Sequence, residues 1–453
     1  MNRPSGRQAI RLSGRQAIRP SGRQAVRWSA FVIALALASP ALAQNDVSAG
    51  PSLLEKAGAT VTLRTGLWSS TRELDADGPF GAAMLWGKVA RPITDRASFL
   101  VDGWTSLRGP FDEGRARGEL REAFVTFASG PIELRAGRQI IAWGRADGIN
   151  PTDNLTPQDL TLLAPDDSDR RLGSTAVRVT YSFRDISATA IWLPEFRSHR
   201  IPVPAGLGDI DGAETEWGAK QFALRIEQTG RAIDWSVSAF RGRDLGPDLG
   251  PSGHQAIGPS GQQASSESAL SLAHHDVRVI GADAAGNVGR FGLRGEVAYT
   301  DTEDSDGTNP FVKNPFLAAV AGADRTYREH LNINVQYLYR FVAHFRSPDP
   351  DAPVFMNLVA AEQAALSGQT RRHQHGASAR ISYKWFHDTL EAEVAAAGYA
   401  QPRGYTLRPK VTYALSDRVK LLVGGELYRG DAASVFGMMR RNSGGFAEVR
   451  WSF

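Results

Sequence analysis

Two histidine motifs are the residues of this 453-residue chain best placed to bind a metal. They are residues 274–276 (HHD) and 373–375 (HQH), and imidazole is a preferred ligand of zinc and copper. Both motifs lie where a loop is expected to meet a strand, so we predict polar rim residues there and no metal site. The chain has no cysteine and no GxSxG, HExxH or GKS/GKT motif. The sequence therefore predicts neither an enzyme nor a cofactor.

A second candidate site is the segment 145–173, in which acidic and basic residues are interspersed. By analogy with general porins, whose third long outer loop folds into the barrel and narrows the pore, we expect these mixed charges to set up a transverse field across a water-filled passage. The alternative is a solvated outer loop whose aspartates bind divalent cations. The residues predicted to form a constriction are Arg145, Asp147, Asp153, Asp159, Arg170 and Arg171.

Such a passage needs walls, and from residue 59 onward the sequence is rich in predicted strands. Polar and apolar residues alternate in segments of about ten residues, as in transmembrane strands with one face on lipid and one on a polar lumen. In residues 447–453, Ala, Val, Trp and Phe alternate with Glu, Arg and Ser. Charged side chains on so many strands would be costly in a dry core. The pattern predicts an all-β fold, a transmembrane antiparallel β-barrel.

The polar faces of these strands contain bases that we expect to line the lumen. A cationic excess would favour anionic solutes, whereas pairing with the glutamates of the same faces would leave the lumen nearly neutral. The predicted lumen-facing bases are Arg64, Arg121, Arg135, Arg178, Arg225, Arg294, Arg380, Lys384, Arg408 and Lys410.

The connections between strands alternate in length, which is typical of short periplasmic turns and long outer loops. Segment 145–173 is the third long loop. A weak strand at 315–327, followed by a turn at 328–330, gives a count of 18 strands, with 16 as the alternative. The other short turns are expected at 93–96, 128–131, 183–186, 227–230, 284–287, 386–389 and 415–418.

Seven tryptophans lie near predicted strand ends. We expect them to form an aromatic girdle at the lipid interface, with a soluble protein core as the alternative. They are Trp68, Trp86, Trp104, Trp143, Trp192, Trp217 and Trp385.

The N-terminal residues have the features of a secretory signal. Residues 1–43 hold seven arginines and no acid, followed by an apolar stretch and the triplet Ala-Leu-Ala. We expect cleavage near Ala43, a periplasmic segment at 44–58 and a barrel at 59–453. Beyond residue 43, 45 bases face 48 acids, so the basic character belongs to the leader and we expect no nucleic-acid partner. The repeat PSGRQAIR of the leader returns in degraded form in a loop at 244–270, and we assign the repeat no function.

Two stretches resemble a Gram-negative outer-membrane barrel family catalogued as a domain of unknown function. They are residues 119–153, which contain GRQIIAWGRADGINPTD, and residues 279–299. Porin-like and alginate-export-like barrels are similar more distantly. The terminal Phe453 resembles the signature that the barrel assembly machinery reads. The family resemblance implies a barrel with a transport or envelope role.

These observations predict an outer-membrane channel that passes small solutes and could favour anionic ones. The alternative is an export or import port for lipid-like or polymeric cargo that works with a periplasmic transport partner. The other expected partners are outer-membrane lipid and lipopolysaccharide.

Overall fold

The computed structural model describes residues 53–70, 79–108, 116–203, 214–251, 270–346, 349 and 351–453. The chain divides into two units, Met1–Asn45 and Asp46–Phe453, and all described residues belong to the second. The predicted signal peptide (1–43) and most of the repeat in the 244–270 loop lie outside the described residues. Every described strand belongs to the second unit.

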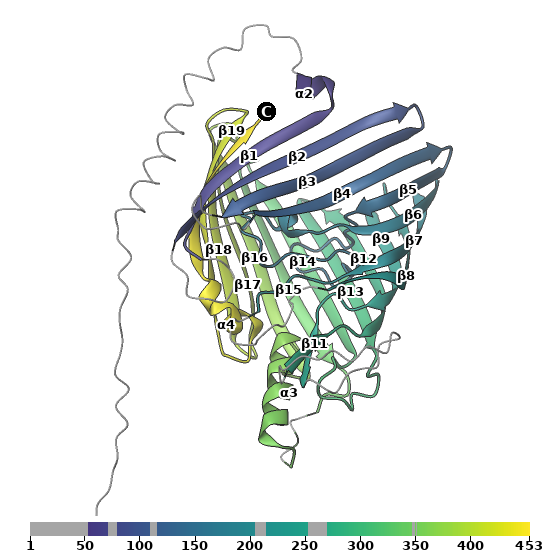
Figure 1. Ribbon diagram of the computed structural model, residues 1–453, viewed down its shortest axis with the longest axis vertical. Helices are drawn as coiled ribbons and strands as arrows, with labels where there is room; N and C mark the ends of the chain where they lie inside the picture. The colour runs from purple at the N-terminus through teal and green to yellow at the C-terminus, as the bar shows by residue number, and fades with distance from the viewer. Residues whose placement is uncertain are drawn as a thin grey trace, which may run out of the picture. The chain divides into compact units, whose positions relative to one another are not determined.

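Eighteen strands form one antiparallel sheet in which each strand pairs with the next, and the sheet closes because β1 pairs with β20 (Figure 1). The predicted count of 18 is confirmed. The strands are β1 (Ala59–Trp68), β2 (Phe80–Thr94), β3 (Ala97–Arg108), β4 (Ala116–Ser129), β5 (Ile132–Gln139), β6 (Ser174–Phe183), β7 (Ile186–Arg197), β8 (Thr215–Gln228), β9 (Ile233–Arg243), β12 (Asp276–Val288), β13 (Phe291–Thr302), β14 (Phe316–Tyr327), β15 (Leu331–Val342), β16 (His373–Trp385), β17 (Leu390–Tyr399), β18 (Gly404–Ala414), β19 (Val419–Gly430) and β20 (Gly444–Ser452).

Closure of the barrel depends on the seam between the first and last strands. The register runs from Thr62 opposite Ser452 to Trp68 opposite Phe446. Beyond the last paired residue, the backbone nitrogen of Phe453 donates to Val61 O at 2.9 Å. A closed sheet has no unpaired edge, and in a bilayer every backbone polar group needs such a partner.

At one end of the barrel every connection between strands has two to four residues, whereas at the other end all but the four-residue connection 400–403 are longer. The turn predicted at 284–287 is wrong, because β12 continues to Val288 and the chain reverses at Gly289 and Arg290. Gly289 has a φ of +60°, a left-handed conformation that glycine adopts without steric cost. The local Ala-Ala-Gly-Asn sequence resembles a turn, but pairing with β9 and β13 holds it extended.

Several long loops contain short elements. They are β10 (Asp248–Pro251) paired with β11 (Leu270–Ala273), α3 (Val354–Leu366), α4 (Val435–Met438), η1 (Asp167–Arg170) and η3 (Met439–Asn442), and α2 (Leu53–Lys56) precedes β1. Figure 1 shows α3 and β11 at the end of the barrel away from the C-terminus. Within the described residues, no helix combines the length and apolar character needed to cross a membrane.

The two faces of the barrel wall differ in the way expected in a membrane. Along β13, Val297 and Tyr299 are exposed on the outer face, while Glu296 and Thr300 are buried on the inner face. This distribution of polar and apolar residues is the reverse of that in a soluble protein, because lipid covers the apolar outer side and the polar residues face the lumen.

The predicted aromatic girdle is only partly correct. Trp192 and Trp385 are exposed on the outer face and Trp217 is exposed at the long-loop end of β8, but Trp68, Trp86, Trp104 and Trp143 are buried inside the barrel. Successive strand residues point to opposite faces, so Trp68 shares the lumen side of Arg64, four residues earlier. Position near a strand end does not by itself identify the face of the sheet.

Candidate functional site

Residues 140–173, which join β5 to β6, turn into the barrel, and we call them the inward loop. The loop forms hydrogen bonds or ion pairs with β12, β13, β15, β16, β18, β19 and β20. These strands lie opposite β5 in the closed strand order. A loop that leaves one wall and bonds to the opposite wall crosses the lumen, so the segment predicted to form a constriction lies across the passage.

The first anchor of the inward loop is a buried carboxylate, Glu296 on β13. Its oxygens accept hydrogen bonds from the backbone nitrogens of Arg145 (3.0 Å), Ala146 (3.1 Å) and Thr152 (2.7 Å), and from Thr152 Oγ1 (2.8 Å). Gly144 has a φ of +91°, and a Cβ there would lie 2.6 Å from both carboxylate oxygens. The left-handed backbone and the close approach both require glycine. The glycine of the Trp-Gly-Arg sequence therefore positions the loop against β13.

Two neighbouring loop residues extend this anchor to other strands. Arg145 Nε donates to Asp283 Oδ1 of β12 at 2.7 Å, and Asp147 Oδ2 accepts from Arg380 Nε of β16 at 2.9 Å. The side-chain amide of Gln336 on β15 both accepts from Asp147 N and donates to Asp147 O, at 2.8 Å each. Asp147 is thus held by its side chain and by its backbone.

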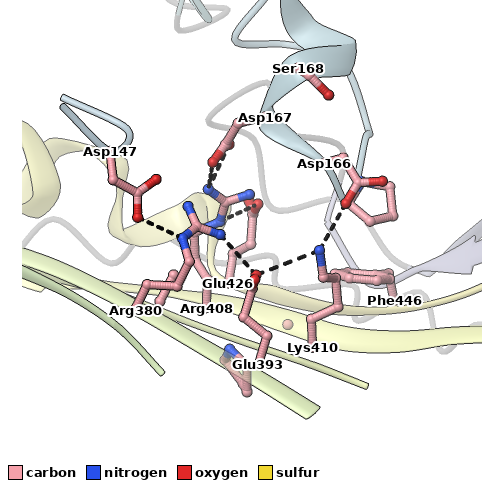
Figure 2. Close-up of a pocket in the computed structure, with 14 residues that line it drawn as sticks. Asp147, Asp166, Asp167, Ser168, Arg380, Glu393, Arg408, Lys410, Glu426 and Phe446 are labelled. Carbon is pink, nitrogen blue, oxygen red and sulfur yellow. Dashed lines mark hydrogen bonds and ion pairs between the residues drawn. The ribbon is translucent and has the colours of Figure 1, made fainter. Parts of the chain in front are cut away.

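An acidic turn near the end of the loop faces bases on the last strands (Figure 2). Asp166 accepts from Lys410 Nζ at 2.8 Å and from Arg450 Nη1 at 2.7 Å. Asp167, the first residue of η1, accepts from Arg408 Nη1 at 2.6 Å. Charge-assisted hydrogen bonds of this kind are stronger than neutral ones, so the turn is held firmly against β18 and β20.

A cavity of about 350 Å³ lies between the inward loop and β16–β20. Figure 2 shows carboxylates of the loop on one side of it and guanidinium and ammonium groups of the wall on the other. Side chains of both signs line this space, which suits a small polar solute. The charged residues around it are Asp147, Asp166, Asp167, Arg380, Glu393, Arg408, Lys410 and Glu426.

The charges at this turn persist at physiological pH. Burial by itself raises the pKa of Asp166, but the positive charges of Arg450 and Lys410 outweigh burial and hold that pKa at about 2. The carboxylate therefore remains ionised, and its contacts with both bases weaken only as the pH falls from about 4 toward 2.

Apolar residues of the inward loop cover the buried tryptophans. Leu163 packs with Trp68 and Phe446, and the ring centroids of these two aromatics lie 4.9 Å apart. Leu162 packs with Trp86 in a neighbouring cluster. These contacts remove aromatic rings from the water of the lumen and stabilise the inward position of the loop.

All six predicted constriction residues lie in the inward loop, and each forms an ion pair. Only part of the set meets the barrel wall, while the rest stabilises the loop or its contact with the next one. Arg145, Asp147 and Arg170 pair with strand residues, Asp153 and Arg171 pair with each other, and Asp159 pairs with Arg200 of the loop after β7.

The ten predicted lumen-facing bases all have a carboxylate oxygen within 3.5 Å of a side-chain nitrogen. On the inner wall these basic residues are therefore paired with acidic ones and do not form a cationic surface. The pairs are Arg64–Asp169, Arg121–Asp102, Arg135–Glu133, Arg178–Glu133, Arg225–Glu227, Arg294–Asp324, Arg380–Asp147, Lys384–Asp388, Arg408–Asp167 and Lys410–Asp166.

Asp166 and Asp167 of the inward loop were absent from the predicted constriction set, and so were two residues of the wall. Arg450 on β20 contacts Asp166, and Glu426 on β19 accepts from Arg170 Nη2 at 2.7 Å. Both lie on the polar sides of their strands, so the two-residue period already contained the signal. Their partners could not be predicted, because they belong to a loop far away in the sequence.

The histidine motifs take part in polar contacts at the strand ends. His274 Nδ1 lies 2.8 Å from Asp244 O, and His275 Nδ1 lies 3.1 Å from a Glu303 carboxylate oxygen. On the outer face, the hydroxyl groups of Tyr337 and Tyr339 contact ring nitrogens of residues 375 and 373. These positions agree with the rim location expected from the sequence.

Comparison with known proteins places the chain in a family. A family model described as "protein of unknown function (DUF1302)" matches residues 108–429, which is more than half of the sequence. The chain belongs to this family. The match includes the inward loop and its Trp-Gly-Arg sequence, and it confirms the resemblance suggested by the motif. A comparison with curated proteins found no match.

Solved outer-membrane porin barrels share the fold of this DUF1302 member. OccAB1 of Acinetobacter baumannii aligns with a TM-score of 0.51 and 11% identity, over 90% of this chain and 98% of that chain. OccAB3 of the same organism gives 0.50 and 12%, over 87% and 98%. OccK5 (OpdH) of Pseudomonas aeruginosa gives 0.50 and 8%, over 87% and 97%. At these identities the likeness establishes the fold alone, a closed antiparallel β-barrel.

Proposed function

We propose that this chain is a channel of the outer membrane, not an enzyme, and that it passes small polar solutes with the inward loop as its constriction. The observation that supports this most directly is the path of the loop. It crosses the lumen, bonds to the opposite wall through Asp147 and Asp166, and leaves a cavity of about 350 Å³ lined by both signs of charge. A narrowed, charged aqueous passage is the arrangement of a selective pore.

A weak preference for small anions belongs to the same proposal. Arg380 uses Nε and Nη1 on Asp147 and Glu393, and Arg408 uses Nη1 and Nε on Asp167 and Glu426. Each guanidinium has five N–H donors, and Nη2 of both residues has no partner among the described residues. Both side chains line the cavity, and we expect these donors to be available to a passing carboxylate or phosphate. The preference is weak because the carboxylates that hold the arginines also repel anions.

The experiment is planar-bilayer conductance of the refolded barrel, begun at Gln44 because we also propose cleavage after Ala43. We expect stable conductance steps. Under a salt gradient, the reversal potential should indicate modest selectivity for anions. Deleting residues 150–168 should raise the single-channel conductance, because it removes the crossing segment. An unchanged conductance after the deletion would show that the loop is not the constriction.

A partner-dependent port for lipid-like or polymeric cargo is the second candidate. The four hydrogen bonds that buried Glu296 accepts from the inward loop favour this port. They fix the loop across the lumen, so large cargo could pass only if a partner protein moved the loop aside. A correctly folded barrel that gives no conductance steps would contradict the channel and favour this port. Conductance that appears only after deletion of the loop would favour it further.

A further inference from the structure

A group of bases faces the membrane at the long-loop end of three neighbouring strands. Lys220 lies on β8, Arg241 on β9 and Arg278 on β12, and all three are exposed. β8, β9 and β12 are consecutive in the sheet. The long loops of an outer-membrane barrel face the cell exterior, so these bases lie at the level of the outer leaflet.

The strand pattern places these side chains on the outer face of the barrel. Arg241 pairs directly with Phe222 on one side and with Arg278 on the other. Phe222 is 53% exposed and Ile280, two residues after Arg278, is 65% exposed. Residues two apart share a face, so the bases cap the lipid-facing apolar band formed by residues such as Leu224.

These bases have few partners in the protein. Among the described residues, Lys220 and Arg241 make no hydrogen bond or ion pair, and Arg278, whose side chain is 68% exposed, only approaches Asp301 at 4.0 Å. Like charges directly opposite each other, as in the Arg241–Arg278 pair, destabilise a sheet. Cations on the lipid face also have a cost that grows with depth in the bilayer. An anion bound between the two arginines would remove both costs.

We propose that Lys220, Arg241 and Arg278 bind the phosphate groups of lipid A in the outer leaflet. Guanidinium groups bind phosphate oxygens in a bidentate manner, and the apolar band below accommodates the acyl chains. Trp192, 45% exposed and paired with Phe222 on the same face, lies beside these bases, at the interface level where indole rings prefer to sit. Asp301 and the exposed Asp276 lower the net positive charge, so the site recognises a phosphate held by two arginines and not a diffuse acidic surface.

The test measures lipid A binding to the refolded barrel in detergent by native mass spectrometry. We expect the unsubstituted barrel to bind bisphosphorylated lipid A at least about tenfold more tightly than enzymatically dephosphorylated lipid A. The double substitution Arg241→Gln and Arg278→Gln should abolish this difference. Arg241→Lys with Arg278→Lys keeps the charges but loses the bidentate geometry, so it should retain only part of the difference. Arg184→Gln with Arg290→Gln, at exposed positions of the short-turn end, is the matched control.

Three outcomes would overturn the assignment. Equal binding of the phosphorylated and dephosphorylated lipids to the unsubstituted barrel would exclude phosphate recognition, and this arm needs no variant. An unchanged preference in the Gln double variant would place the phosphate elsewhere. Equal binding of phosphatidylglycerol would show a general affinity for anionic lipid. Conductance is not read out, so the result stands apart from the proposed channel function.

Discussion

At the scale of single residues, the pairing of charges determines the electrostatics of the passage more than their number does. Arg380 illustrates this, because one guanidinium contacts Asp147 of the inward loop at 2.9 Å and Glu393 of β17 at 3.0 Å. Counting bases on strand faces suggests a cationic lumen, whereas the contacts describe a nearly balanced one. Removing one member of a pair should therefore alter selectivity more than removing an unpaired surface charge.

We expect the reversal potential of Asp147→Asn to show greater anion selectivity and that of Arg380→Gln to show greater cation selectivity. Each substitution leaves the charge of the former partner less neutralised. Bilayer recordings under a salt gradient measure both shifts. Arg290→Gln, which removes an exposed short-turn charge that has no ion pair among the described residues, is the control and should change little. Shifts of the same sign in both test variants would contradict the pairing argument.

A buried residue beneath the loop allows a stability prediction. Glu296 is 4% exposed, and both of its carboxylate oxygens accept hydrogen bonds from the loop. Glu296→Gln therefore replaces one acceptor oxygen with an NH₂ donor. We expect a loss of about 2–3 kcal/mol in the anchoring of the loop, seen as faster hydrogen exchange of residues 144–153. Glu133→Gln is the matched control, since Glu133 contacts only strand arginines. Equal exchange in the two variants would show that Glu296 does not anchor the loop.

At the scale of elements, the inward loop also depends on the loop after β7. His199 Nδ1 accepts a hydrogen bond from the backbone nitrogen of Gln158 at 2.9 Å, which requires an unprotonated ring nitrogen. Burial lowers the pKa of His199 from 6.5 to about 4, although the charge of Asp244 opposes the shift. The neutral ring is therefore part of the contact between the two loops.

This contact predicts a pH dependence. Because the pKa of His199 is depressed in the folded protein, a proton binds its ring more readily in the unfolded chain. The stabilisation by the His199–Gln158 contact is therefore complete above about pH 6.5 and is lost as the pH falls toward 4. His199→Asn keeps an acceptor but cannot titrate, so its thermal unfolding midpoint should fall less than that of the unsubstituted protein between pH 6.5 and 4.5. His387→Asn, on an exposed turn, should behave like the unsubstituted protein. A parallel decline in all three would rule out His199 as the cause.

At the scale of the whole molecule, the barrel exists only when its two terminal strands meet. The β1–β20 seam runs over seven residue pairs and ends with the backbone bond from Phe453 N to Val61 O. The Phe453 side chain is 49% exposed and stacks on Trp451 with centroids 4.9 Å apart. The backbone thus closes the barrel, and the ring stays accessible to a partner.

We predict that Phe453→Ala lowers the amount of barrel inserted in the outer membrane of cells while leaving refolding in detergent intact. The backbone bond that closes the seam remains, whereas the ring proposed to contact the assembly machinery is lost. Quantifying folded barrel in membranes and after in vitro refolding distinguishes the two effects. A defect of equal size in vitro would instead assign Phe453 a structural role.

The sequence by itself determined the class of fold and the composition of the wall. A two-residue period is a local property, so it predicted even the weak strand β14 (Phe316–Tyr327) and the lumen side of Arg408. Tertiary structure decided which groups meet. Asp147 and Arg380 are 233 residues apart, and no local pattern encodes that contact. The same applies to Trp68, whose burial depends on a loop that folds back across the lumen. Local backbone sterics and polarity select strands, whereas the path of the loop follows from the sum of many long-range ion pairs and apolar contacts.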